Sequence, residues 1–307
     1  MKASRVHRFG PPEVVTFEDI ERPEPQDREV LVRVDVAGVG PWDSWIRAGK
    51  SALPQPLPLT LGSDISGTIV ALGADVRAFR VGQAVYGVTN PRFTGAYAEY
   101  AAASAAMIAA KPDKLNHVEA ASVPVVAVTA LQMLDRAGVR SGQRVLIHGA
   151  GGSVGAFAVQ LALAAGAHVI GTDVEQGIEY AASLGRIQAI DIGKTRFEAV
   201  TEPVDAVIDT VGGDAQARSF AVLKPGGSLV SIVSTPDAEL AARGGVSSGF
   251  LLVDVNTDAL TTIAKLLDQG TLKTRVGVVL PHAEASKAHE MLDGLIPRPP
   301  GKILLRI

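Results

Sequence analysis

The sequence contains no cysteine among its 307 residues. This absence excludes disulfide bridges, thiolate catalysis, iron–sulfur ligation and any zinc site that uses sulfur ligands. A strong excess of charge of one sign is also missing, because 29 basic residues stand against 32 acidic ones and the net charge is −3. We therefore expect neither a nucleic acid nor a membrane surface as a partner.

Long apolar runs are missing too. The most apolar stretch, residues 120–134, is interrupted by Ser122, Pro124, Thr129 and Gln132. It falls short of the roughly 18 uninterrupted apolar residues of a membrane span. The opening segment MKASRVHRFGPPEV has no apolar core of the kind that secretory signals contain. We expect a cytoplasmic protein whose length suits two domains.

The N-terminal third is rich in short predicted strands. Residues 30–36 alternate between apolar and polar side chains, and residues 65–72 and 84–88 behave similarly. Glycine and proline occupy the gaps between these runs. Strands at this density, with few helical segments, predict a small barrel-like β domain.

Beyond about residue 112 the pattern changes to alternating strands and helices, which is typical of a doubly wound parallel sheet. The expected strands are 144–147, 168–172, 189–191, 206–209, 228–233 and 250–253, and the expected helices are 118–137, 154–165, 175–184, 215–223 and 257–268. The tail returns to strands at 275–280 and 302–307. We expect a first domain of residues 1–118 completed by 271–307, with residues 119–270 inserted as a nucleotide-binding domain.

The stretch HGAGGSVG, residues 148–155, lies between a predicted strand and a predicted helix. In the dinucleotide-binding fingerprint such small residues permit a tight turn, close approach of the pyrophosphate and close packing of helix on strand. The N-terminus of the following helix would direct free N–H groups at the diphosphate. The expected contacts are Ala150, Gly152, Ser153, Val154 and Gly155. We expect His148 to position backbone rather than to move protons.

Asp173 ends the second strand, at roughly the 20-residue spacing at which a carboxylate accepts the ribose hydroxyls. Because it would repel a 2′-phosphate, Asp173 favours NADH over NADPH. The alternative is that Asp173 only caps the helix that follows. Thr210 and Val211 follow another strand, at the end where such sheets bind ligands.

Segments along the whole chain resemble the medium-chain dehydrogenase/reductase superfamily, and within it the zinc-independent NAD(P)H quinone oxidoreductase (zeta-crystallin-like) branch. The segments are GSDISGTIVALGADVRAFRVGQAVYG (62–87), GAYAEY (95–100), EAASVPVVAVTAL (119–131), VLIHGAGGSVGAFAVQLA (145–162), DAVIDTVGG (205–213), LKPGGSLVSIVS (223–234) and GKILLRI (301–307). The resemblance implies an α/β protein with a GroES-like β-barrel catalytic domain and an inserted Rossmann domain. It also implies an NADPH or NADH cofactor and a homodimer.

The resemblance further places several residues near the nicotinamide or the pyrophosphate. These are Thr129, Ile232, Val233, Ser234, Phe250, Leu251, Leu252 and Lys302. Most members of this branch use NADPH, so family habit and Asp173 point to different cofactors.

Zinc-dependent relatives carry a Cys after the first long strand and a His in a Gly-His-Glu motif. The corresponding positions here are Gly40 and Ser63, and neither residue type is a zinc ligand. We therefore expect no metal site. Quinone reductases usually have Asn at the position of Gly40, and this departure leaves open which group orients the substrate carbonyl.

Without a metal or a thiol, the chemistry favours a quinone or a conjugated enone as hydride acceptor, because the charge that forms is delocalised. The candidate acceptor pocket consists of Gly40, Trp42, Asp43, Trp45, Leu53 and Phe93. Asp43 and Asp64 are candidate acids, although a structural role in turns is favoured for both. Alternative functions are an enoyl reductase of secondary metabolism and a nucleotide-binding sensor or structural protein without significant turnover.

Overall fold

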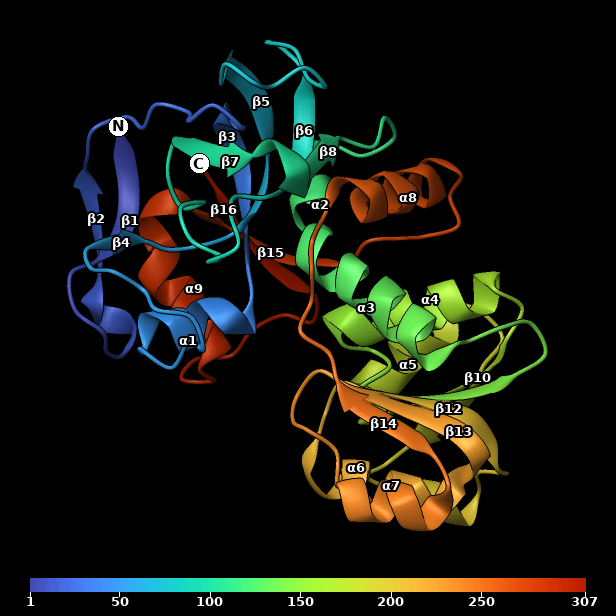
Figure 1. Cartoon of the computed structure of the whole chain (residues 1–307). Helices are drawn as coiled ribbons and strands as arrows, with labels where there is room; N and C mark the ends of the chain where they lie inside the picture. The colour runs from blue at the N-terminus through green and yellow to red at the C-terminus, as the bar shows by residue number, and fades with distance from the viewer. The chain divides into compact units, whose positions relative to one another are not determined.

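The computed structural model describes residues 1–307, and the chain divides into two compact units (Figure 1). Unit 1 comprises Met1–Val125 and Val255–Ile307, and unit 2 comprises Val126–Asp254. Unit 2 is thus shorter at both ends than the segment 119–270 expected from the sequence. Each unit is built around its own sheets.

Helix α8 (Thr257–Asp268) accounts for the difference on the C-terminal side. The sequence predicted that it extends the doubly wound sheet, which is wrong, because α8 belongs to unit 1. Tyr86 Oη donates to the carbonyl of Leu260 at 2.6 Å, and Thr257 Oγ1 donates to the carbonyl of Ile108 at 2.8 Å. The apolar stripe of a helix shows that one face is buried but not which sheet covers it.

Unit 1 contains two sheets and short helices. A three-stranded sheet has the order β2-β1-β4, and a seven-stranded sheet has the order β15-β16-β3-β5-β6-β8, with β7 also paired to β3. The strands are β1 (Lys2–Val6), β2 (Val15–Asp19), β3 (Glu29–Val39), β4 (Leu59–Thr60), β5 (Asp64–Leu72), β6 (Ala84–Val88), β7 (Tyr100–Ser104), β8 (Ile108–Ala110), β15 (Val276–Pro281) and β16 (Lys302–Arg306). The helices besides α8 are α1 (Pro41–Arg47), α2 (His117–Ala121) and α9 (Ala285–Leu292), with 3₁₀ turns η1 (Pro12–Val14), η2 (Ala105–Met107) and η5 (His282–Glu284).

Strand β3 organises the larger sheet of unit 1. It is antiparallel to β5 and to β16, so its C-terminal end lies beside the first residues of both neighbours. Val39 pairs with Ile303, and Ala37 pairs with Ile65. Residues that follow β3 are therefore brought next to residues that precede or begin β5 and β16.

Unit 2 has a six-stranded sheet in the order β11-β10-β9-β12-β13-β14, and every pair is parallel. The doubly wound sheet predicted from the sequence is confirmed. The strands are β9 (Arg144–His148), β10 (His168–Asp173), β11 (Gln188–Asp191), β12 (Val204–Asp209), β13 (Leu223–Ser231) and β14 (Ser247–Phe250). The helices are α4 (Ser153–Ala164), α5 (Glu175–Ser183), α6 (Gly213–Ser219) and α7 (Ala238–Gly244), with 3₁₀ turns η3 (Phe197–Ala199) and η4 (Phe220–Val222).

Three local expectations are corrected. The single helix expected at 118–137 is two helices, α2 and α3 (Pro124–Ala137), because Pro124 disfavours helical backbone in the residue before it. The strand expected at 250–253 ends at Phe250. Helix α7 was not predicted, although Asp237 caps it by accepting from two backbone N–H groups.

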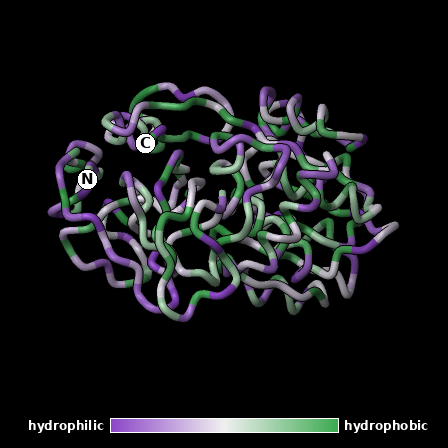
Figure 2. Tube along the Cα trace, turned by 90° about the horizontal axis from the view of Figure 1, so that it is seen from above, coloured by the Kyte–Doolittle hydropathy of each residue, from purple (hydrophilic) through white to green (hydrophobic).

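The core strands of unit 2 are apolar on both faces. Val145, Leu146 and Ile147 of β9 and Val207 and Ile208 of β12 are all completely buried. A parallel sheet covered by helices on both sides requires such runs. In Figure 2 hydrophobic and hydrophilic residues nevertheless alternate over short distances along the whole trace, and no helix has the length and apolar character needed to cross a membrane.

Candidate functional site

The glycine-rich loop of unit 2 leads from β9 into α4, and its glycines serve different purposes. Gly149 has a φ of +70°, which residues with side chains rarely adopt. A Cβ on Gly151 would lie 2.1 Å from the carbonyl oxygen of Gly177, and a Cβ on Gly155 would lie 2.0 Å from that of Gly149. These two positions need glycine because backbone segments touch there.

Gly152 is the least crowded glycine of this loop. Its φ is −72°, and a Cβ there would meet only the carbonyl oxygen of Gly149, at 3.1 Å. A side chain would project from the N-terminus of α4, which no side chain caps. The N–H groups of the first turn are thus available to an anion, and the space over Gly152 suits a diphosphate.

The five loop residues predicted from the sequence all lie on this loop or on the first turn of α4. Ala150 is completely buried, and its N–H donates to the carbonyl of Thr172 at 3.0 Å. It therefore anchors the loop to β10, whereas Gly152, Ser153 and Val154 form its outer side. The structure brings these residues together as the glycine fingerprint indicated.

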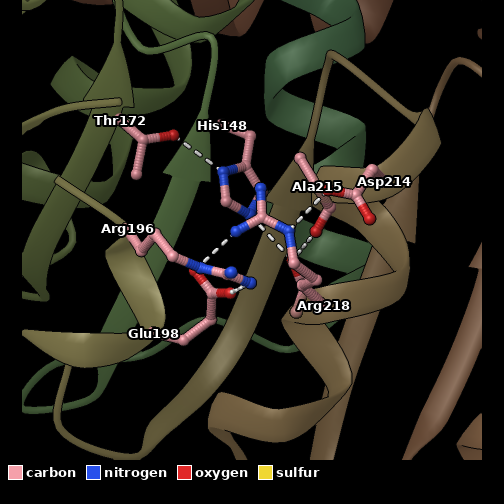
Figure 3. Close-up of polar contacts among 8 residues, drawn as sticks. His148, Thr172, Arg196, Glu198, Asp214, Ala215 and Arg218 are labelled. Atoms are coloured by element: carbon pink, nitrogen blue, oxygen red, sulfur yellow. Dashed lines mark hydrogen bonds and ion pairs between the residues drawn. The ribbon is translucent and has the colours of Figure 1, made fainter. Parts of the chain in front are cut away.

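The imidazole of His148 is buried at the end of β9, between Thr172 and helix α6 (Figure 3). Ser219 Oγ donates to the carbonyl of Ala215 at 2.7 Å, so it accepts from His148 Nε2 at 2.8 Å. The other ring nitrogen, Nδ1, then accepts from Thr172 Oγ1 at 2.7 Å. Burial lowers the pKa of His148 to about 4, so the ring is neutral at neutral pH and positions β9, β10 and α6.

An ion-pair network covers the His148 side chain (Figure 3). Arg218 pairs with Glu198 at 2.6 Å and with Asp214 at 2.8 Å, and its guanidinium lies 4.9 Å from the centroid of the Phe197 ring. Phe197 in turn packs edge-on against His148, with the ring centroids 4.8 Å apart. The neutral imidazole is thereby shielded from water.

Asp209, which the sequence analysis did not single out, is completely buried at the end of β12. Its Oδ1 accepts from two backbone N–H groups of the following loop at 3.0 and 2.8 Å. Its Oδ2 accepts from Ser231 Oγ at 2.7 Å and from Gln216 Nε2 at 2.9 Å. Four donors compensate the buried charge and fix the loop that carries Thr210 and Val211. The signal in the sequence was an acidic residue at the end of an apolar strand.

The remaining predicted residues of unit 2 lie mostly at the same edge of its sheet. Thr210 Oγ1 donates to the carbonyl of His148 at 2.7 Å, which joins the loops after β12 and β9. Ile232, Val233 and Ser234 follow β13, and Phe250, Leu251 and Leu252 lie at the end of β14. Large apolar side chains are exposed along this carboxyl edge, at Val174, Val211, Val233, Phe250 and Leu252. Thr129 is instead buried within α3.

Asp173 lies against the glycine loop. Its Oδ2 accepts from the N–H of Gly151 at 2.8 Å, and its Oδ1 accepts from the N–H of Val174 at 2.8 Å. The alternative role as a helix cap is wrong, because the N-cap of α5 is Val174 and no side chain caps it. Asp173 is therefore a carboxylate fixed beside the candidate phosphate site.

Further charges lie near Asp173. Asp191 is its register partner on β11, and Lys194 Nζ bridges Asp191 at 3.0 Å and Glu175 at 2.9 Å. Two carboxylates thus hold a single ammonium group on the strand next to the one that ends at Asp173. Lys194 was not found from the sequence, because the turn after β11 is distant from Asp173 along the chain.

In unit 1, the end of β3 meets the starts of β5 and β16. Lys302 Nζ and Asp64 Oδ2 form a buried ion pair at 2.8 Å, and Asp64 Oδ1 accepts from the N–H of Val125 at 3.1 Å. The Lys302 ammonium also lies 4.4 Å from the centroid of the Trp42 ring. Trp42 Nε1 donates to Ser63 Oγ at 2.9 Å. The structure thus brings Trp42, Ser63, Asp64 and Lys302 into one cluster.

Asp43 is completely buried in helix α1 and holds its first turn. Its Oδ2 accepts from the N–H of Gly40 at 2.8 Å and from Tyr97 Oη at 3.1 Å, while Oδ1 has no partner. Burial raises the pKa of Asp43 to about 7 despite these two donors. Asp43 shapes the turn after β3, which agrees with the structural role favoured from the sequence.

Three other predicted pocket residues are accessible. Trp45 is 55% exposed and Leu53 is 44% exposed. Phe93 is half-buried and lies edge-on to Trp42, with centroids 6.3 Å apart. The pocket candidates therefore divide into a buried group beneath Trp42 and an outer aromatic and aliphatic group.

A zinc ion does not fit the residues of unit 1. Gly40 offers no ligand, and the Ser63 oxygen is engaged by the indole N–H. No group of three or more His, Cys, Asp or Glu side chains comes together in a metal-binding arrangement. The donor set that zinc requires is not assembled.

The raised pKa of Asp43 has a consequence for stability. The folded chain favours the neutral form of Asp43. The contribution of this carboxyl group to the free energy of unfolding is therefore fully present below about pH 4 and is lost as the pH rises through about 7. We expect Asp43→Asn to flatten the decline in the free energy of unfolding between pH 4 and 8, by on the order of 4 kcal/mol. Urea unfolding at several pH values measures this decline. The control Asp113→Asn removes an exposed carboxylate and should retain the decline in the free energy of unfolding. An unchanged decline in Asp43→Asn would show that Asp43 is ionised throughout this pH range.

Family comparisons cover both units. Residues 26–113 match the alcohol dehydrogenase GroES-like domain, and residues 184–305 match the zinc-binding dehydrogenase family. The quinone oxidoreductase of Sus scrofa is 32% identical over 308 residues, which cover 94% of this chain and 93% of the relative. The 2-methylene-furan-3-one reductase of Solanum lycopersicum is 32% identical over 285 residues, covering 89% of this chain and 70% of the relative.

Solved structures give the same result. The quinone oxidoreductase from Coxiella burnetii superposes with a TM-score of 0.92 at 36% identity, covering 100% of this chain and 99% of that chain. The mycobacterial protein Rv1454c complexed with NADPH has a TM-score of 0.87 at 26% identity, with 100% of both chains covered. The chain therefore belongs to the quinone oxidoreductase family of the medium-chain dehydrogenase/reductase superfamily.

Proposed function

We propose that this oxidoreductase transfers hydride from a reduced nicotinamide dinucleotide to a quinone or a conjugated enone, without zinc. The observation that carries the proposal is the uncapped N-terminus of α4, which begins at the glycine-rich loop after the first strand of a doubly wound sheet. A diphosphate fits there, because helix N–H groups bind anions. A bound reduced nicotinamide supplies the hydride.

The residues that would hold the dinucleotide come from several loops at the carboxyl edge of the unit 2 sheet. Gly152, Ser153 and Val154 would contact the diphosphate, and Asp173 the adenosine ribose. Ala150 and Gly155 would support the loop from within. Further contacts are proposed for Thr129, Thr210, Val211, Ile232, Val233, Ser234, Phe250, Leu251, Leu252 and Lys302.

The acceptor class follows from the groups that unit 1 provides. A saturated ketone develops a localised alkoxide that needs a strong electrophile, such as a metal ion. Apart from buried Asp43, the side chains at the proposed acceptor site are aromatic, aliphatic or already paired, and they do not form a zinc site. A quinone or enone spreads the incoming charge over its conjugated system, so positioning in a dry pocket suffices.

Two alternatives remain distinct from this proposal. The similarity to the 2-methylene-furan-3-one reductase supports an enone as acceptor. An enoyl reductase, in contrast, would prefer acyl thioesters over quinones. A nucleotide-binding protein without turnover would bind NADH but reduce none of these acceptors. A panel of quinones, enones and enoyl thioesters separates the three functions.

The first test combines that panel with a loop variant. We expect NADH or NADPH to be oxidised at 340 nm with quinones or enones. Gly152→Val should weaken cofactor binding by more than about a hundredfold, because the side chain occupies the diphosphate's space. The fold should remain, since a Cβ at this position meets a single atom, the carbonyl oxygen of Gly149 at 3.1 Å, and a small shift relieves that contact. Gly244→Val, at the end of α7 and outside the loop, is the control, because a Cβ there meets only side-chain atoms of Val246, at 3.7 and 3.8 Å. Undiminished cofactor binding by Gly152→Val would overturn the proposed loop register.

We propose NADH as the preferred cofactor. Asp173, Glu175 and Asp191 concentrate negative charge at the adenosine end, and Lys194 is held by two of these carboxylates. Repulsion of a 2′-phosphate at contact distance would cost on the order of 1–3 kcal/mol, or roughly ten- to a hundredfold in affinity.

Asp173→Ser tests this preference directly. The wild type should bind NADH more tightly, and the variant should gain affinity for NADPH while losing some for NADH. Serine retains an oxygen that can accept from the Gly151 N–H. Titration of both cofactors against both proteins measures the ratio, with Glu179→Ser on the exposed face of α5 as control. A wild type that prefers NADPH and a variant with the same ratio would refute the role of Asp173.

We also propose a homodimer that pairs through strand β14. This strand forms one edge of the unit 2 sheet (Figure 1), and an unpaired edge invites association. The exposed side chains of Phe250 and Leu252 would add apolar contact. Light scattering should return twice the chain mass of 31.8 kDa. The mass of a single chain across micromolar concentrations would contradict the dimer.

A further inference from the structure

Gly40 is glycine because of the space it leaves, not because of its backbone. Its φ of −134° and ψ of 164° are extended, and any residue adopts them. A Cβ on Gly40 would lie 2.3 Å from Cη2, 2.4 Å from Cζ2 and 2.6 Å from Cζ3 of Trp42. Atoms this close to three adjacent ring carbons would overlap with the six-membered ring. The missing side chain therefore makes room for the indole.

The indole is fixed by contacts on other sides as well. Ser63, which is completely buried, accepts the Nε1–H at 2.9 Å. Lys302 Nζ lies 4.4 Å from the ring centroid and is itself held by buried Asp64. The cation–π contact is stronger when the ammonium is desolvated, as it is here. Trp42 thus has a single preferred orientation in unit 1.

The ring of Phe93 also packs against the Trp42 indole, and the backbone of Phe93 is strained. Phe93 is the one residue other than glycine with a positive φ, at 60°. Neighbouring bonds hold this conformation, because the carbonyl of Thr94 accepts from Thr89 Oγ1 and from Asn90 Nδ2, each at 2.7 Å. The result is an aromatic ring set edge-on to Trp42 at an interplanar angle of 77°. Such backbone strain is typical of functional sites.

The indole is supported in this way and yet only half-buried. A rigid aromatic surface binds a flat partner with little loss of side-chain entropy. A flat conjugated ring gains the most from such a surface, and a small flexible enone gains little.

We propose that Trp42 determines acceptor specificity: its fixed indole is the wall that selects extended planar acceptors, of the naphthoquinone class, over small acyclic enones. Gly40 and Ser63 are positioning residues that admit the ring and fix its N–H. This inference rests on the proposed function and adds to it the size and shape of the preferred acceptor.

Steady-state kinetics with 1,4-naphthoquinone and with a small acyclic enone tests the selection. Trp42→Leu should lower kcat/KM for the naphthoquinone about tenfold, mainly through KM, and that for the enone less than about twofold. An unchanged circular dichroism spectrum of the variant controls for folding. An equal loss for both acceptors would overturn the proposal.

A double-mutant cycle tests the role of Gly40. Gly40→Ala should displace the indole and lower naphthoquinone efficiency in the wild-type background. In the Trp42→Leu background the same substitution should have little effect, because no ring occupies the space. Independent, multiplying effects of the two substitutions would show that Gly40 does not act through Trp42.

A binding measurement separates failure of this inference from failure of the proposed function. The chain has 2 tryptophans, so Trp45→Phe leaves Trp42 as the only indole. Naphthoquinone should quench the fluorescence of Trp45→Phe strongly and that of Trp42→Phe weakly, whether or not turnover occurs. A wild type that reduces neither quinones nor enones would overturn the proposed function, whereas quenching that survives only in Trp42→Phe would overturn the role of Trp42.

Discussion

The candidate cofactor site depends on backbone contacts at the carboxyl ends of β9 and β10. The N–H groups of Gly149 and Ala150 both donate to the carbonyl of Thr172, at 2.9 and 3.0 Å. Gly155 approaches Gly149 so closely that no Cβ fits between them. These contacts set where α4 begins and which way its N–H groups point. The position of Gly152, and hence the site for an anion, follows from this packing.

Polar side chains beneath the loops keep this arrangement rigid. Buried His148 engages both ring nitrogens, and buried Asp209 accepts from four donors. Neither side chain is available for acid–base chemistry, because its hydrogen-bonding atoms already have partners within the chain. Unit 1 follows the same rule, since Lys302 is paired with Asp64 and the Trp42 N–H with Ser63. The acceptor site that we propose in unit 1 therefore consists mainly of positioned aromatic and aliphatic surface.

Much of the fold could be predicted from the sequence, because its signals are local. The glycine loop, the apolar strands of unit 2 and the position of Asp173 follow from spacing and periodicity. The placement of α8 could not, since an apolar helix face fits more than one sheet. Contacts between distant segments were also missed, such as Lys194 beside Glu175 and the Trp42 ring over Gly40. These contacts depend on the tertiary fold, which local sequence patterns do not predict.

The central claim is direct hydride transfer to a conjugated acceptor without a metal ion. Reduction of an enone with NADH that carries deuterium at both hydrogen positions of C4 tests it most directly. The account predicts deuterium at the β-carbon of the product, a proton from water at the α-carbon, and the same rate after treatment with a zinc chelator. Loss of activity with the chelator and recovery on adding zinc, or a product without deuterium at the β-carbon, would contradict it.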